Sequence, residues 1–492
     1  MFVEVPVVVA LLVLTTLYFL ITRKQDQNSP PGPFSYPLLG NFPQLGPVLH
    51  LSLTDLGKDF NGLYRLHLMG KKINVINRGK TAKDVLVNEG KNVGDRTSAY
   101  VIDLMTRNGC SLIFGKLGPT WKSQRKMVHS ALRFYSGGSA DVENLIIKEA
   151  NELNEILRST KGTAIDPKLP LTLCVMNVIC SLVYGKRYEL DDKEFHQIVT
   201  NTEALAKLAS PENPLILLPW LRHFPIKTVK RMNEIIKERD RIVKEKIDDH
   251  RRSYRSGVTR DLTDTILKCM EDENNNGLLT DDHLHMAVSD VFLAGFETTT
   301  TALRWILLYL ILYPEVQAKI HQELDEVVGS DQAPWLEHKE RLPYLQATIN
   351  EVMRISPVFP IIRRKAIGDF KIDGYDINKG SFVYVNLWAI HHDPEEWDSP
   401  YEFRPERFLK DPEKSQNMFP FGAGTRVCIG KSLAKSELFL IVSRLLHEFE
   451  LTLPPGSMRP DPTGLTSTVY WPKPFQVCAV KRFQNFNNVE LC

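Results

Sequence analysis

One ten-residue loop, Phe421–Gly430, constrains this chain more than any other segment. Its sequence, FGAGTRVCIG, places Cys428 between two glycines and runs directly into a Lys-Ser pair. A phosphate-binding loop needs four residues between its glycines, whereas Gly424 and Gly430 enclose five. A dinucleotide fingerprint also fails, because Val427 stands where its third glycine belongs. The loop therefore offers a single soft ligand, the cysteine sulfur, rather than a cradle for phosphates.

The neighbours of Cys428 favour a flat cofactor with one axial ligand. Gly424 and Gly430 have no Cβ, so backbone can approach a cofactor and direct N–H groups at a thiolate. Arg426 is a fixed cation that can pair with an acidic group at the cofactor's edge. No second cysteine or histidine lies nearby, which argues against zinc and iron–sulfur sites because these take several protein ligands. Haem needs only one axial ligand, while the alternative is a small buried hydrophobic cysteine.

Composition is that of an ordinary globular protein. Of 492 residues, 43% are hydrophobic and 24% are charged, and a net charge of +2 gives no reason to expect nucleic acid. No repeat, low-complexity tract or Ser/Gly-rich linker divides the chain after residue 45, so we expect one large, mainly helical catalytic domain. The seven cysteines include no C-x-x-C pair and are typical of reduced thiols in a cytosol-facing protein.

The N-terminus has the pattern of a signal anchor. Residues 5–21 form a run of seventeen residues without a charge, at the short end of what spans a bilayer. Arg23 and Lys24 follow it, and positive charge should hold that side in the cytosol. A cleaved signal peptide is the alternative, but it requires a basic n-region and a small-residue cleavage site, and neither is present here. We predict a transmembrane anchor over 1–22, a basic and proline-rich linker over 23–48, a catalytic domain over 49–485 and a tail over 486–492.

Hydrophobic periodicity predicts mostly helices with small β-sheets. Residues 63–77 alternate apolar and polar side chains around Gly70 and are typical of a β-hairpin. Residues 229–247 carry an apolar stripe at helical spacing, with charge on the other face. The stripe consists of Met232, Ile235, Ile236, Ile242, Val243 and Ile247.

A second helix, around residues 290–305, carries polar groups in an apolar run. Glu297 and four consecutive threonines follow the apolar residues, and such hydroxyls often bond back to the i−4 carbonyl and bend a helix. One interpretation is a helix of weak propensity. The other, which the family resemblance given next implies, is a groove over haem in which Thr298 holds O₂ and water while Glu297 supplies protons, a relay of the right chemical type.

Five segments in sequence order resemble the cytochrome P450 monooxygenases. The cysteine loop resembles their haem-binding loop, and residues 294–301 resemble their oxygen-binding helix. Trp121 and Arg125 match a W-x-x-x-R pattern, Glu351 and Arg354 an E-x-x-R pair, and RPERF supplies Arg407. The resemblance covers residues 30–480 in outline. It implies the cytochrome P450 fold, mainly α with small β-sheets, as a single catalytic domain behind the membrane anchor.

The resemblance also implies roles for individual residues. Cys428 would be the metal ligand, giving haem b its axial thiolate, and Arg125 and Arg426 would bind the haem propionates. Arg364, or its neighbour Arg363, would add a third propionate contact. The other cofactor-binding residues would be Trp121, Phe421, Gly424 and Gly430. Thr298 and Glu297 would be catalytic.

The E-x-x-R pair is assigned to folding rather than to catalysis. Such a pair occurs by chance on many helix surfaces, since i,i+3 ion pairs are common there. If Glu351, Arg354 and Arg407 instead form a buried network, that network is structural, because a missing partner would leave an uncompensated charge. We expect the buried network, supporting the haem loop.

These features predict a haem-thiolate monooxygenase that inserts one oxygen atom from O₂ into a lipophilic substrate. The chain has no nicotinamide or flavin fingerprint, so NADPH would serve only indirectly, through a reductase. The expected partners are NADPH–cytochrome P450 reductase and, as a second candidate, cytochrome b5, with no nucleic acid. Lys122, Lys126, Lys431 and Lys435 either steer an acidic partner or are simply solvated. The expected location is the endoplasmic reticulum membrane, single-pass, with the catalytic domain facing the cytosol.

Three segments resemble the steroid 17α-hydroxylase/17,20-lyase group of this family in particular. They are AGFETTTTALRW, NLWAIHHDPEEW and LLPWLRHFPIKT. Thr202 stands where that group carries an asparagine that binds the steroid's A-ring oxygen, and Asn350 replaces a basic residue associated with cytochrome b5 and lyase chemistry. The alternatives are a xenobiotic or polycyclic-aromatic hydroxylase and, from other classes, a gas carrier or sensor, a peroxide isomerase or a non-catalytic lipid-binding protein. Glu297 and Thr298 disfavour the gas and peroxide proteins, which need no proton delivery.

Overall fold

The computed structural model describes Val13 and residues 28–97, 99–136, 140–210, 213–217, 219–224, 226–255, 258–271 and 278–482. The chain forms two compact units. The sheet unit comprises Met1–Thr97, Pro360–Pro400 and Gly422–Val427, and the helical unit comprises Ser98–Phe359, Tyr401–Phe421 and Cys428–Cys492. The predicted membrane anchor lies outside the described residues except for Val13, and the predicted domain boundaries stay predictions. In the part of the chain that the structure describes, no helix is both long and apolar enough to cross a membrane.

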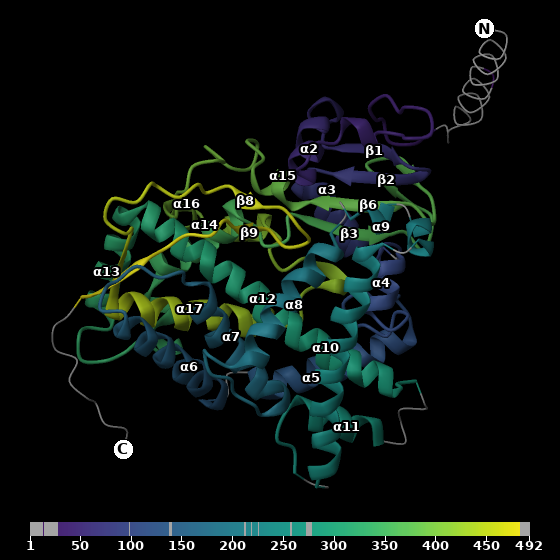
Figure 1. Cartoon of the computed structure of the whole chain (residues 1–492). Coiled ribbons are helices and arrows are strands. Elements are labelled where there is room, and N and C mark those ends of the chain that lie inside the picture. Colours follow the sequence, from purple (N-terminus) through teal and green to yellow (C-terminus); the bar gives the residue numbers. More distant parts are fainter. Residues whose placement is uncertain are drawn as a thin grey trace. The chain divides into compact units, whose positions relative to one another are not determined.

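A four-stranded sheet in the order β1-β2-β6-β3 forms the core of the sheet unit (Figure 1). The strands are β1 (Leu63–Leu68), β2 (Lys71–Ile76), β3 (Ile361–Lys365) and β6 (Phe382–Asn386). β1 and β2 are antiparallel around Met69 and Gly70, both at positive φ, which confirms the predicted hairpin. β6 runs parallel to β2 and antiparallel to β3. On β3, alternation buries Ile362 and Arg364.

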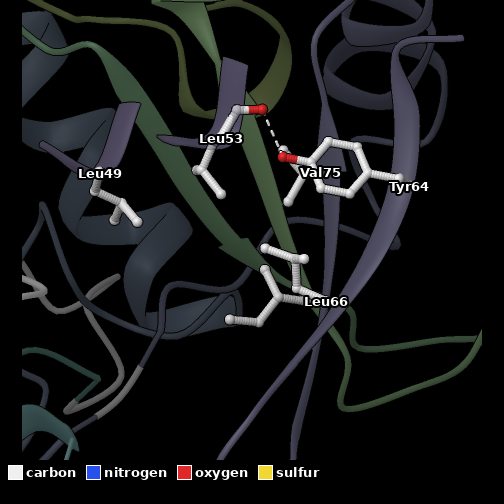
Figure 2. Close-up of a cluster of buried hydrophobic side chains, with 6 residues drawn as sticks. Leu49, Leu53, Tyr64, Leu66 and Val75 are labelled. Atoms are coloured by element: carbon white, nitrogen blue, oxygen red, sulfur yellow. Dashed lines mark hydrogen bonds between the residues drawn. The ribbon is translucent and has the colours of Figure 1, made fainter. Parts of the chain in front are cut away.

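The sheet is covered on one side by α2 (Leu49–Leu56). Leu49 and Leu53 of this helix pack against Tyr64, Leu66 and other apolar side chains of β1 and β2 (Figure 2). The Tyr64 hydroxyl donates to the Leu53 carbonyl at 2.6 Å, so the ring buries its apolar body without leaving its polar tip unpaired. The unit's remaining elements are η1 (Phe42–Gln44), η2 (Lys58–Phe60), α3 (Gly79–Lys83), η3 (Asp84–Asn88), β4 (Phe370–Ile372), β5 (Tyr375–Ile377), α15 (Leu387–His391) and η8 (Gly424–Arg426).

The helical unit is built around α12 (Asp281–Leu312), which packs against α7 (Lys168–Tyr184) and α17 (Lys431–Glu448). Every residue from Thr299 to Leu312 is buried, and from Trp305 onward the helix is apolar all round, as a buried helix requires. Gly295 permits a close approach to α7, since a Cβ there would lie 2.7 Å from the Ile179 Cδ1.

Other helices and two short sheets complete the helical unit. They are α4 (Tyr100–Met105), α5 (Pro119–Ser136), α6 (Ala140–Ser159), α8 (Lys193–Leu208), α9 (Pro214–Leu217), η4 (Pro219–His223), α10 (Lys227–Ser253), α11 (Leu262–Glu271), α13 (Pro314–Val327), η6 (Leu336–Arg341), α14 (Pro343–Ile355), α16 (Glu406–Lys410) and η7 (Pro412–Asn417), with β7 (Phe449–Thr452) paired to β10 (Cys478–Lys481) and β8 (Gly464–Leu465) paired to β9 (Trp471–Pro472). The predicted apolar stripe lies buried on α10, as expected.

The predicted ion network is present in the helical unit. Glu351 and Arg354 on α14 are fully buried, and the Arg354 Nε lies 2.8 Å from the Glu351 Oε2. Arg407 on α16 donates from Nε to the other carboxylate oxygen at 3.1 Å. The network ties α14 to the segment that precedes the cysteine loop, which fits the structural role assigned to it.

Candidate cofactor and oxygen site

Cys428 lies immediately before α17, in the helical unit. Its backbone N–H donates to the Phe421 carbonyl at 2.9 Å, which closes the loop. Burial raises the pKa of the Cys428 thiol, while the Gly430 N–H and the charges of Arg125 and Lys431 lower it. Cys428 nevertheless keeps exposed surface, so a ligand can reach its sulfur. N–H donors and cations beside an accessible sulfur stabilise its thiolate form, as metal ligation requires.

Arg125 and Trp121 lie on α5 of the same unit. The guanidinium carbon of Arg125 is 5.4 Å from the centroid of the Trp121 ring, and the Trp121 Nε1 donates to the Leu112 carbonyl at 2.9 Å. Burial lowers the pKa of Arg125, and the Cys428 charge acts in the opposite direction. The structure therefore brings Cys428, Arg125 and Trp121 into one neighbourhood, with the cation held by an aromatic ring.

Gly424, Arg426 and Arg364 belong to the sheet unit. Gly424 has a φ of +66°, and a Cβ there would lie 1.7 Å from the Leu86 carbonyl oxygen. Its glycine is therefore required by the approach of the backbone of η3, a packing reason that the sequence did not reveal. Arg426 is buried, and its Nε donates to the Gly94 carbonyl at 2.8 Å.

Arg364 is the more unusual of the two buried cations. Arg364 is 2% exposed, and its Nη1 donates to the Arg363 carbonyl at 3.2 Å. Burial and the neighbouring charge of Arg426 lower the pKa of Arg364 to about 9. No carboxylate among the described residues pairs with Arg364. Two buried like charges are costly unless an anion joins them, so the pair is suited to an acidic ligand such as a haem propionate.

On α12, Glu297 and Thr298 are each held by a different partner. The Thr298 hydroxyl donates to the Ala294 carbonyl at 2.7 Å, and the Thr301 hydroxyl donates to the Glu297 carbonyl at 2.8 Å. This confirms the predicted bonding back to i−4. The Glu297 carboxylate accepts from the Trp471 Nε1 at 2.6 Å. Burial raises the pKa of Glu297, which favours the protonated form that a proton donor needs.

A family model described as "Cytochrome P450" matches residues 30–479. This chain belongs to the cytochrome P450 family. It is 37% identical to the steroid 17-alpha-hydroxylase/17,20 lyase of Ictalurus punctatus, over 92% of this chain and 91% of that protein. It is 39% identical to the protein of the same name from Squalus acanthias, over 90% of each chain.

The fold of this P450 also matches solved structures. A zebra fish cytochrome P450 determined with progesterone has a TM-score of 0.80 and 34% sequence identity, covering 88% of this chain and 99% of that chain. A second zebra fish structure, determined with abiraterone, has a TM-score of 0.78 and 33% identity over the same shares. The predicted fold class, mainly helical with small sheets, is confirmed.

Family membership makes this P450 a haem-thiolate monooxygenase whose electrons come from a redox partner and whose substrate is lipophilic. The residues present fit the cofactor. An accessible cysteine lies beside an N–H donor and cations, and the buried cation Arg364 has the charge of Arg426 beside it. When bound, the haem supplies the iron at which O₂ is activated.

Three polar residues of this P450 were missed at the sequence level. Trp471 gave no signal, because nothing local marks a tryptophan on a short strand as a partner of Glu297. Glu437 on α17 is almost fully buried, accepts from the Thr299 hydroxyl at 3.3 Å, and has a pKa raised to about 8 by burial. Asp290 lies two helical turns before Glu297 on α12 and accepts from Ser111; an acid in an apolar helix was the available signal.

Proposed function

We propose that this P450 hydroxylates a steroid, a C21 progestogen, near C17. The observation that carries the proposal is the match to the zebra fish enzyme determined with progesterone, which extends over 99% of that chain. The proteins of Ictalurus punctatus and Squalus acanthias, named for 17α-hydroxylation and 17,20-lyase chemistry, add support. Overall, O₂, two electrons and two protons would convert a substrate C–H into C–OH and release one water.

Each site residue has a role in this proposal. Cys428 would supply the thiolate ligand of the iron, and the Gly430 N–H would stabilise that thiolate. Arg125, Arg426 and Arg364 would bind the haem propionates, and burial of Arg426 and Arg364 would strengthen such pairs because water screens them little. The list of cofactor contacts is completed by Trp121, Phe421, Gly424 and Gly430.

Thr298 and Glu297 would relay the two protons, drawn from solvent, that the reduction of O₂ consumes. The Thr298 hydroxyl can accept a hydrogen bond while it donates one to the Ala294 carbonyl. Glu297 is partly buried, and burial raises the pKa of its carboxyl, which favours the protonated form. An alcohol beside an acid in the next position is thus able to pass protons inward.

The steroid itself would be oriented by α8. Thr202 on this helix is buried, and its hydroxyl makes no hydrogen bond to the described residues, so it is available to a ring oxygen of the substrate. Threonine is shorter than asparagine, so binding should be looser in orientation and the products more mixed. Asn350 on α14 carries no positive charge, so carbon–carbon cleavage should be weak.

The proposed redox partners are chosen from the surface charge of the helical unit. Lys122 and Lys126 on α5 and Lys431 and Lys435 on α17 are exposed on the two helices that flank Cys428 in the helical unit. This basic group suits an acidic electron donor, which we assign as NADPH–cytochrome P450 reductase, with cytochrome b5 as a second partner. The charge-free segment 5–21 would anchor the enzyme in the endoplasmic reticulum membrane. Trp220 and Phe224, 56% and 55% exposed, would add a second contact with lipid.

Incubation with steroids tests the substrate. Progesterone and pregnenolone should each displace water from the haem iron, which is seen as a spectral shift, and mass spectrometry should detect a hydroxylated C21 product with little C19 product. A polycyclic aromatic compound serves as the comparison ligand. Absence of both the shift and the product with steroids, together with oxidation of the aromatic compound, would overturn the steroid assignment in favour of the aromatic hydroxylase.

A further inference from the structure

The carboxyl group of Glu297 is held by a residue from a distant part of the chain. Trp471, on β9, lies 174 positions from Glu297 and donates its indole N–H to Oε1 at 2.6 Å. Trp471 is 7% exposed, so water competes little for this N–H. An indole has a donor and no acceptor, so the direction of this hydrogen bond is fixed.

The surroundings of Glu297 balance its charge without replacing this bond. Two cations, Arg304 on α12 and Lys168 on α7, act on the carboxyl, and Glu203 on α8 opposes them. Lys168 and Glu203 form an ion pair with each other, and Arg304 donates to the Pro472 carbonyl at 3.2 Å. Trp471 is therefore the hydrogen-bond partner of the Glu297 side chain among the described residues, and no charged group pairs with that carboxyl directly.

This bond decides which carboxyl oxygen can carry a proton. Because Oε1 of Glu297 accepts the indole N–H, a proton added to the carboxyl goes to Oε2, which has no hydrogen-bond partner among the described residues. A protonated carboxyl donates only through the oxygen that bears its proton. Trp471 thus turns Glu297 into a donor of fixed direction, whereas a free carboxyl would donate through either oxygen.

We propose that Trp471 is a positioning residue for oxygen activation, holding Glu297 so that its Oε2 carries the proton destined for Thr298. The inference rests on the proposed role of Glu297 as proton source. A misdirected acid would deliver protons late, and electrons would then leave as peroxide or water instead of entering product.

Trp305 offers a matched control, because it lies on α12 like Glu297 and bonds to Tyr470, the residue directly before Trp471. Its indole N–H donates to the Tyr470 carbonyl at 2.9 Å, and its ring stacks on that of Tyr470. Trp305→Phe therefore removes one indole hydrogen bond between α12 and residues 470–471, as Trp471→Phe does. It leaves the Glu297 bond in place. Any effect of loosening the contact between α12 and the β8–β9 sheet should appear in both variants.

The first measurement is product formed per NADPH in the reconstituted holoenzyme. Trp471→Phe should lower this ratio about tenfold and raise peroxide, while Trp305→Phe keeps the ratio of the parent. Trp471→His, which restores a ring N–H, should recover part of the loss. Because the Trp471 bond lowers the pKa of Glu297, the pH at which coupling declines should move upward in Trp471→Phe.

The second measurement does not depend on turnover. With ¹⁵N-labelled indoles in the reduced, carbon monoxide-bound holoenzyme, the seven tryptophans should each give one N–H signal. The signal assigned to Trp471 should shift in Glu297→Gln more than the signal of Trp305. This arm stays informative even if Trp471→Phe folds poorly.

The outcomes separate the inference from the function on which it rests. If Glu297→Gln leaves coupling unchanged, the proposed role of Glu297 fails, whatever Trp471 does. If Glu297→Gln uncouples the enzyme but Trp471→Phe behaves like Trp305→Phe, the positioning role is overturned. An unmoved Trp471 indole signal in Glu297→Gln would overturn the contact itself.

Discussion

Replacing Glu351 by glutamine should destabilise the protein by about 4 kcal/mol, because it removes the carboxylate that pairs with two buried cations. The Glu351 carboxylate accepts two hydrogen bonds from Arg354, both at 2.8 Å, and one from the Arg407 Nε at 3.1 Å. It also accepts from the Arg404 N–H at 2.9 Å. Glutamine keeps the shape of the side chain, so little cavity forms and the loss of charge dominates.

The magnitude follows from burial. Removing one partner of a buried ion pair costs about 3–5 kcal/mol, since the remaining charge is left in a medium of low dielectric. The entropy of unfolding is about 2.1 cal/mol/K per residue, which for a domain over residues 49–485 amounts to about 0.9 kcal/mol/K. A loss of about 4 kcal/mol should therefore lower Tm by about 4 °C.

The control is an ion pair of similar chemistry on the surface. Glu245 pairs with Arg241 at 2.7 Å on α10, and their side chains are 53% and 49% exposed. Glu245→Gln should cost less than about 1 kcal/mol. Thermal unfolding followed by circular dichroism, at one scan rate for all variants, compares the two. Equal Tm values for Glu351→Gln and Glu245→Gln would refute the argument that the buried charge matters.

Three further predictions concern the site and pH. Cys428→Ser should abolish the thiolate-type band of the reduced carbon monoxide complex, and a retained band would rule out Cys428 as the ligand. Thr298→Ala should leave haem and substrate binding intact while lowering product per NADPH about tenfold; unchanged coupling would mean that Thr298 is only structural. His250 lies 2.7 Å from Asp261, and that bond together with the nearby Asp264 raises its pKa above its usual value against the effect of burial. Its contribution to stability is complete below the unfolded-state pKa and disappears as pH rises through the folded-state value, so His250→Gln should lower Tm more at pH 6 than at pH 9; an equal loss at both pH values would contradict this.

Several features of this P450 follow from short-range sequence patterns. The spacing around Cys428 excluded a phosphate loop within ten residues, and alternation about Gly70 predicted the hairpin of β1 and β2. The threonine run after Phe296 predicted bonding back to i−4 carbonyls, which the Thr298 hydroxyl makes. Each of these properties depends on neighbours within one or two turns, so the residues that determine it are adjacent in the sequence.

Other features depend on which distant residues the fold brings together. The sequence marked Glu297 as an acid beside a hydroxyl, but its partner Trp471 comes from a strand 174 residues away. The sequence linked Gly424 to a cofactor, and the structure adds a packing requirement, because its missing Cβ makes room for the Leu86 carbonyl of a separate segment. Periodicity can say that a side chain is buried, whereas its hydrogen-bond partner is chosen by the packing of whole elements. The sequence by itself therefore determined the type of chemistry at this site, and only the tertiary structure decided what holds each reactive group, because those contacts join parts of the chain that no local pattern relates.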